Sequence, residues 1–189
     1  MNISFAKDGN WKEQLLQCYT FRMSETPDFT QREKCIAGIA NPTHKEGFDN
    51  ISLISKEKYG VGVTATLHCS FVGDGCPEII LVEQPRTDPD GAVRYDHCFE
   101  VVLWQNGINV WRYHPVDGKC VCHQRLGLTY SVPQNTVHEL TVTVKEDQLL
   151  INLNGQKTLL RTEDLPEKFY IGVTACEGEV ELYDFTVRE

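Results

Sequence analysis

Two tryptophans and a tyrosine alternate with polar residues in the stretch FEVVLWQNGINVWRY, residues 99–113. Aromatic rings offer flat apolar surfaces, and tryptophan and tyrosine add a polar group at one end. A carboxylate and an amide nearby, from Glu100 and Asn109, add hydrogen-bonding groups that can orient a ligand. Such a mixture could bind a small molecule or a protein partner if the strands place it on one surface.

The dipeptide Asn106-Gly107 lies between two alternating, β-rich runs and predicts a hairpin with a two-residue type I′ turn. With that loop, the expected cross-strand pairs are Gln105–Ile108, Trp104–Asn109, Val102–Trp111 and Glu100–Tyr113. One face then carries Glu100, Val102, Trp104, Asn109, Trp111 and Tyr113. The other carries Phe99, Val101, Leu103, Ile108, Val110 and, near the open end, Arg112. The aliphatic second face belongs in a core. The first face is either a binding surface or packs against a loop from the first fifty residues.

The composition indicates a globular protein of one domain, residues 1–189, with 41% hydrophobic residues and a mean hydropathy of -0.33. A net charge of -9 without a Lys/Arg cluster argues against a nucleic-acid partner, and the same sign argues against anionic membranes. The apolar runs are too short to span a bilayer. The start MNISFAKDGNWKEQ lacks the pattern of a secretory signal, and free thiols are expected for the 8 cysteines, so we expect a cytoplasmic location.

From residue 59 onward the chain alternates strand-like runs with turns, without helices between them. In HELTVTVKEDQLLINLNGQ a tight Glu-Asp turn predicts a second hairpin. Its expected core pairs join Leu140, Val142 and Val144 to Leu149, Ile151 and Leu153. The strand-and-turn pattern predicts an all-β fold, a two-sheet antiparallel sandwich, and excludes a parallel α/β fold.

The first fifty residues form a less regular segment that is expected to pack on the sandwich. NWKEQLLQCYTF is compatible with a helix capped by Asn10, with Glu13 completing a capping box, and equally with an edge strand. Residues 23–50 have the polar, Pro- and Gly-containing composition of a long surface loop.

The second half of the chain resembles the concanavalin A-like lectin/glucanase superfamily, including its laminin-G-like domains. The resemblance rests on GVGVTATLHCSF, EVVLWQNGINVWRY, HELTVTVKEDQLLINLNGQ and FYIGVTACEGEVELYDFTV. It implies a jelly-roll sandwich with an oligosaccharide or polysaccharide fragment across the concave sheet. In that setting Trp104, Trp111 and Tyr113 would stack on pyranose rings, while Glu100 and Asn109 would bond to hydroxyls.

Two other functions remain open: an intracellular glycoside hydrolase of the same fold, and a sandwich that binds a protein through an aromatic patch. Hydrolysis needs two carboxyl groups about 5 to 9.5 Å apart. Glu177, Glu179 and Glu181 resemble the acid-x-acid-x-acid pattern of family 16 glucanases, but the middle acid there is aspartate, and Gly178 indicates that Glu177 lies in a turn. A pair drawn from Glu78, Glu83 and Glu100 is a further option.

Neither a metal nor a cofactor is expected. Cys120, Cys122, His123 and His114 do not match a zinc spacing. The turns DPDG, residues 88–91, and GDG, residues 73–75, contain oxygen ligands but not a full calcium loop, so structural calcium is an unsupported option.

Overall fold

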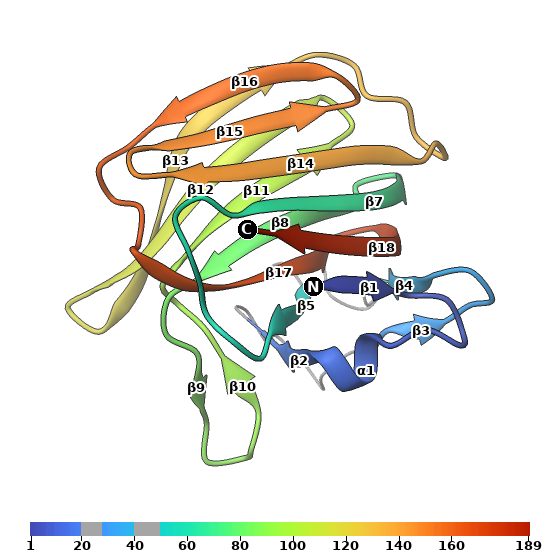
Figure 1. The fold of residues 1–189 in the computed structure, drawn as a ribbon, viewed down its shortest axis with the longest axis horizontal. Helices are drawn as coiled ribbons and strands as arrows, with labels where there is room; N and C mark the ends of the chain where they lie inside the picture. Colours follow the sequence, from blue (N-terminus) through green and yellow to red (C-terminus); the bar gives the residue numbers. More distant parts are fainter. Residues whose placement is uncertain (20–27, 40–49) are drawn as a thin grey trace.

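The computed structural model describes residues 1–19, 28–39 and 50–189, and these fold into two antiparallel sheets packed face to face (Figure 1). Among the described residues the helical element is a single turn, α1 (Trp11–Gln14). No helix in this part of the chain has the length and apolar character needed to cross a membrane. The sequence-based prediction of an all-β, two-sheet antiparallel sandwich is confirmed.

The first sheet has the strand order β16-β15-β14-β7-β18-β4-β3, and β1 also pairs with β18. Its strands are β1 (Asn2–Ser4), β3 (Thr30–Gln31), β4 (Ile36–Ile39), β7 (Thr64–Val72), β14 (His138–Lys145), β15 (Gln148–Leu153), β16 (Gln156–Arg161) and β18 (Glu179–Arg188).

The second sheet has the order β13-β12-β11-β8-β17-β5-β2, and β6 also pairs with β17. Its strands are β2 (Leu15–Cys18), β5 (Asn50–Ser55), β6 (Tyr59–Gly60), β8 (Cys76–Val82), β11 (Cys98–Trp104), β12 (Gly107–Val116), β13 (Lys119–Thr129) and β17 (Lys168–Cys176). A separate two-stranded hairpin, β9 (Arg86–Thr87) and β10 (Val93–Arg94), projects from one end of the sandwich (Figure 1).

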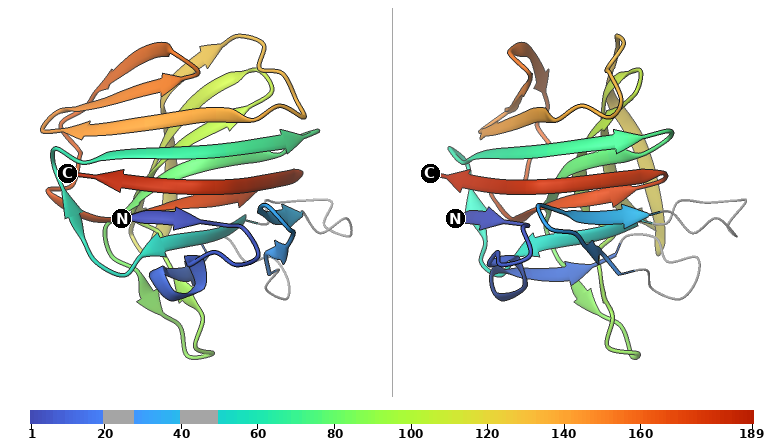
Figure 2. Two further views of the ribbon diagram at one scale, coloured as in Figure 1. Left: turned by 45° about the vertical axis from the view of Figure 1, so that its right-hand side comes forward. Right: turned by 90° about the vertical axis from the view of Figure 1, so that its right-hand side faces the viewer.

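The core lies between the two layers, which Figure 2 shows from two sides. Alternate residues of each strand point inward because the side-chain period of a strand is two. From the first sheet, β14 and β15 contribute the predicted pairs: Leu140 with Leu153, Val142 with Ile151 and Val144 with Leu149. From the second sheet, Val101 and Val110 are fully buried partners on β11 and β12.

The hairpin β11–β12 forms where it was predicted, but its register is different. Trp104 pairs with Gly107, Val102 with Asn109 and Glu100 with Trp111, so the loop consists of Gln105 and Asn106. The turn is therefore not the expected type I′ turn at Asn106-Gly107. Gly107 instead has a φ of 133°, and a Cβ there would lie 1.8 Å from the carbonyl oxygen of Leu128. Only glycine accepts both conditions.

This error in register did not change the faces. The loop lies one residue earlier than predicted, so each residue of β11 pairs with a β12 residue two positions earlier than predicted. A shift of two residues keeps every side chain on the same face of the sheet. The predicted core face, including Phe99, Leu103 and Ile108, is fully buried in the sandwich. Glu100, Trp104 and Trp111 therefore still share the opposite face.

The start of the chain combines both structures that the sequence left open. Residues 11–14 form one helical turn, and residues 15–18 form an edge strand paired with β5. The capping box is absent, because the Asn10 side chain accepts a hydrogen bond from the Ser4 amide and donates one to the Asn2 carbonyl. Within the predicted loop 23–50, residues 30–31 and 36–39 are strands of the first sheet, while residues 23–27 and 40–49 lie outside the described part.

Candidate functional site

The outer face of the second sheet holds a pocket of about 330 Å³, on the side facing away from the core. All five predicted site residues line it: Glu100, Trp104, Asn109, Trp111 and Tyr113. They come from β11 and β12, where alternation places them opposite the aliphatic core residues. The other lining residues come from β11 itself, from other strands of the same sheet and from the bend after β17: Val102, Asn50, Cys76, Glu78, Cys122, Cys176 and Glu177.

The aromatic side chains form one wall of the pocket. Trp104, Trp111 and Tyr113 are all half-buried, so part of each ring remains accessible. Among the described residues no hydrogen-bond acceptor lies near Nε1 of Trp104, which is itself buried. Buried indole N–H groups normally have a hydrogen-bond partner, so this unpaired donor is an exception among the described residues of the pocket wall.

Strand β13 pairs with β12 and carries Gln124, whose side chain contacts Asn109 in the pocket lining. The Gln124 side chain donates a hydrogen bond to Oδ1 of Asn109 at 3.0 Å. This bond orients the amide so that its NH₂ group can face a ligand. The pairing of β12 with β13 shifts between Val110 and Trp111, which is the irregularity expected of a β-bulge.

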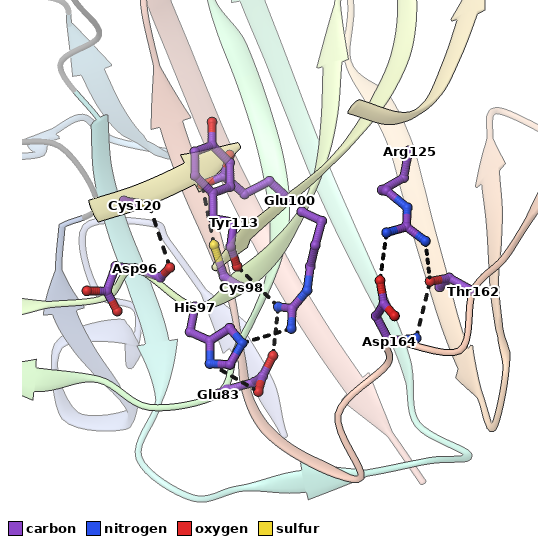
Figure 3. Close-up of polar contacts among 11 residues, drawn as sticks. Glu83, Asp96, His97, Cys98, Glu100, Tyr113, Cys120, Arg125, Thr162 and Asp164 are labelled. Atoms are coloured by element: carbon purple, nitrogen blue, oxygen red, sulfur yellow. Dashed lines mark hydrogen bonds and ion pairs between the residues drawn. The ribbon is translucent and has the colours of Figure 1, made fainter. Parts of the chain in front are cut away.

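Two buried carboxyl groups lie on the floor of the pocket. Glu78 on β8 and Glu100 on β11 are each 3% exposed. Glu100 pairs with Ile80 and Val102 pairs with Glu78, so the two glutamates are diagonal neighbours on one face, with Cβ atoms about 7 Å apart or slightly less. Figure 3 shows Glu100 beside Cys98 and Tyr113. The Cys98 thiol points to Oε1 of Glu100 at 3.9 Å.

Burial changes the protonation of these groups. It raises the pKa of the Glu78 carboxyl well above its usual range, and the charges of Glu100 and Glu177 add to the increase. Burial, with the nearby charge of Glu100 second, also raises the pKa of the Tyr113 hydroxyl. The pKa of Glu177 rises through burial and through the charge of Asp74. These shifts favour the protonated, uncharged form of Glu78, which can donate a hydrogen bond.

The acidic triplet Glu177, Glu179 and Glu181 does not form a catalytic strand. Glu177 has a φ of 59° and lies in a bend, as Gly178 suggested, and it alone reaches the pocket. Glu179 and Glu181 lie on β18 of the first sheet, and both form ion pairs with Arg32. The triplet is thus divided between the bend after β17 and strand β18.

Glu83 is also separate from the pocket. Its carboxylate is 2.7 Å from the Arg112 guanidinium, which donates a hydrogen bond to Nε2 of His97 at 2.9 Å and lies over the Phe99 ring. Figure 3 shows Glu83 against His97. Burial lowers the pKa of His97, with the neighbouring Arg112 charge acting in the same direction. These contacts hold Glu83 against Arg112 and His97, outside the pocket lining.

The candidate metal ligands are dispersed. Cys122 faces the pocket opposite Tyr113, while His114 and His123 lie on the other face of the same strands and stack with ring centroids 5.3 Å apart. The described residues contain no group of three side chains suited to hold a metal ion. Of the two acidic turns, DPDG uses its first aspartate, Asp88, to pair with Arg86 and Arg94.

Comparison with known structures identifies the fold. A carbohydrate-binding module, CBM66 from Bacillus subtilis, matches with a TM-score of 0.65 and 10% identity over 86% of this chain and 92% of its own. The Bacillus licheniformis β-glucanase matches with a TM-score of 0.64 and 9% identity over 100% and 97%. A legume lectin-like domain from Entamoeba histolytica matches with a TM-score of 0.60 and 17% identity over 98% and 96%.

The chain therefore has the concanavalin A-like lectin/glucanase fold, as the resemblance implied. No protein-family model matches it, and no curated protein matches it in sequence. At these identities the likeness establishes the architecture, and the chemistry has to be argued from the pocket.

Proposed function

We propose that this protein binds carbohydrate in the pocket on the outer face of its second sheet. The observation that supports this most strongly is the gathering of Trp104, Trp111 and Tyr113 with Glu100 and Asn109 around one hollow. Sugar rings have apolar faces that stack on aromatic rings, and hydroxyl edges that need carboxylate and amide partners. Lectins and carbohydrate-binding modules among the structural neighbours support the same ligand class.

A glycan-array screen followed by tryptophan fluorescence titration tests the proposal. Trp111→Ala is expected to reduce the affinity for a bound glycan at least about tenfold, because one stacking surface is lost. Trp111→Phe keeps a ring and is expected to retain part of the affinity. Leu159→Ala, on the exposed part of β16 in the first sheet, is the control and leaves binding unchanged. Glycan binding that survives Trp111→Ala at full strength would contradict the proposal.

Glycoside hydrolysis is the second candidate, supported by the buried pair Glu78 and Glu100. The raised pKa of Glu78 favours the protonated form that a general acid needs, and Glu100 would act as nucleophile or as base. Hydrolysis assays on the glycans that bind distinguish the two functions. Loss of turnover in Glu78→Gln with binding retained would establish the enzyme, and intact glycans after prolonged incubation would establish a binding module.

The third function, recognition of a protein through the aromatic patch, is tested by the same screen. It would gain support if no glycan bound and the Trp111→Ala variant lost a protein partner. The shape of the pocket argues against this third function. A hollow of about 330 Å³ fits a small ligand better than it fits the flat surface of a protein partner.

A further inference from the structure

Strand β13 carries one extra residue beside the pocket. Trp111 on β12 pairs with Gln124. The preceding residue, Val110, pairs with Leu126, so Arg125 is the inserted residue of a β-bulge. A bulge redirects the side chains next to it. Gln124, directly before the insertion, is the residue opposite Trp111 of the pocket lining.

The inserted arginine holds the bulge from outside the pocket. Its guanidinium contacts the Asp164 carboxylate at 2.6 Å and donates a hydrogen bond to Oγ1 of Thr162 at 3.1 Å (Figure 3). Both partners lie in the segment between β16 and β17, and neither lines the pocket. A change in the Gln124 side chain therefore leaves this anchor of the bulge in place.

The Gln124 side chain makes two hydrogen bonds through one atom. Its Nε2 donates to Oδ1 of Asn109 at 3.0 Å and to the backbone carbonyl of Leu126 at 3.4 Å. A carbonyl only accepts, so the Gln124 atom shared by the two partners is the nitrogen. Asn109 therefore turns its oxygen towards β13. Its NH₂ group is turned the other way, towards Val102 on β11, which also lines the pocket.

Gly127 leaves the space that the Gln124 amide occupies. A Cβ at residue 127 would lie 2.7 Å from Nε2 of Gln124 and 3.6 Å from Oδ1 of Asn109. The backbone of Gly127 does not have a positive φ, so its conformation does not demand a glycine. What the missing side chain provides is room for the amide of Gln124.

We propose that Gln124 is a positioning residue that fixes Asn109 as a hydrogen-bond donor, so that the pocket selects a sugar with an acceptor oxygen at this point. This inference rests on the proposed carbohydrate-binding function and specifies one contact of its ligand. Gln124 does not line the pocket, and it acts through the amide of Asn109. A sugar hydroxyl meets the requirement by accepting from Asn109 and donating its own proton elsewhere.

Gln124→Glu reverses this arrangement with little change in shape. An ionised carboxylate accepts hydrogen bonds and cannot donate one. The Asn109 amide is then expected to turn over and donate to the new carboxylate. Its oxygen faces the pocket, where it repels any ligand atom that can only accept. Gln156→Glu, an exposed glutamine on β16 of the first sheet, is the matched control.

Nuclear Overhauser spectroscopy of the full chain without ligand reads the orientation of the amide. In the unchanged protein the side-chain NH₂ protons of Asn109 are expected to give their strongest cross-peaks to the Val102 methyl groups on β11. In Gln124→Glu the strongest cross-peaks are expected to the α-protons of Gly127 on β13. Gln156→Glu is expected to keep the pattern of the unchanged protein.

Fluorinated sugars read the selectivity. The probes are the methyl glycosides of glucose, mannose and galactose and their monofluoro analogues, followed by fluorine NMR and by tryptophan fluorescence. Fluorine accepts a hydrogen bond weakly and cannot donate one. At least one monofluoro hexoside is expected to bind the unchanged protein and to lose about fivefold or more in affinity in Gln124→Glu. Its parent sugar, whose hydroxyl can also donate, is expected to change by about twofold or less.

Gly127→Ala separates the position of Gln124 from its charge. The added methyl group displaces the Gln124 amide, and no charge is introduced. The same monofluoro hexoside is expected to bind about twofold to fivefold more weakly. Tm is expected to change by about 2 °C or less, because only the flexible end of an exposed side chain has to move. Unchanged cross-peaks and unchanged selectivity in this variant would overturn the positioning role.

The remaining outcomes separate this inference from the function on which it rests. If parent sugars or array glycans bind and no monofluoro hexoside does, the acceptor assignment is overturned and carbohydrate binding stands. If neither the parent hexosides nor any array glycan binds, the carbohydrate-binding function fails and the selectivity fails with it. The cross-peaks require no ligand, so an unchanged pattern in Gln124→Glu overturns the positioning role whatever the pocket binds.

Discussion

The protonation of Glu78 predicts a measurable link between pH and stability. Its carboxyl is buried, and its pKa in the folded protein is raised well above the ordinary value of 4.5. Above that value the unfolded chain loses the proton while the folded protein keeps it. The unfolded state then binds fewer protons, so the free energy of unfolding falls as the pH rises. This loss continues until the pH passes the pKa of the folded state.

Glu78→Gln removes this loss, because glutamine is nearly isosteric and does not ionise. Relative to the variant, the unchanged protein should lose about 1.4 kcal/mol of stability for each pH unit within the interval. For a chain of 189 residues this corresponds to about 3 to 5 °C in Tm per pH unit. The variant is therefore expected to be the more stable protein at neutral pH.

Urea unfolding of both proteins at several pH values between mildly acidic and neutral measures the difference. Glu100→Gln is a second test, since removing the charge of Glu100 lowers the pKa of Glu78 and so narrows the interval. Glu139→Gln, whose side chain is about half exposed, controls for a general effect of losing one carboxyl. A stability difference that stays constant with pH would show that Glu78 is not held as a neutral acid, and the reasoning about the pocket would fail.

Three further substitutions test other parts of the structure. Gly107→Ala forces a Cβ against the Leu128 carbonyl at a positive φ and should cost more than about 1 kcal/mol, measured by urea unfolding; an unchanged midpoint would contradict the turn geometry. Phe99→Ala, in the core face of β11, should cost about 3 to 5 kcal/mol in the same assay while the remaining folded protein still binds glycan. Arg112→Met should cost about 3 kcal/mol or more because it leaves the Glu83 carboxylate uncompensated, and Glu83→Gln added to it should restore part of the loss.

Much of the fold followed from alternation in the sequence. The β14–β15 hairpin has the predicted pairs because both strands alternate strictly and the turn is short. The β11–β12 hairpin shows where this reasoning fails. The loop moved to Gln105 and Asn106 because Gly107 was needed inside β12, where the β13 backbone passes too close for any side chain. The close approach comes from Leu128 on β13, so no residue pattern next to Gly107 indicates it.

The site was predicted in part for the same reason. Trp104, Trp111 and Tyr113 share a face because side chains alternate along the two strands of one hairpin. The sequence alone contains that alternation. The partnership of Glu78 with Glu100 depends on β8 lying beside β11, which is a choice of strand order. Alternation in PEIILVE places Glu78 opposite a core residue, but only the sheet shows which neighbour it meets.

Cys76 on β8 and Cys176 on β17 are directly opposed in the sheet that carries the pocket. Directly opposed residues in an antiparallel ladder have Cα atoms about 4.5 to 5.5 Å apart, a span that a disulfide can bridge. Both thiols are free and both line the hollow beside Glu78. A disulfide formed between them would join β8 to β17 directly beneath a bound ligand.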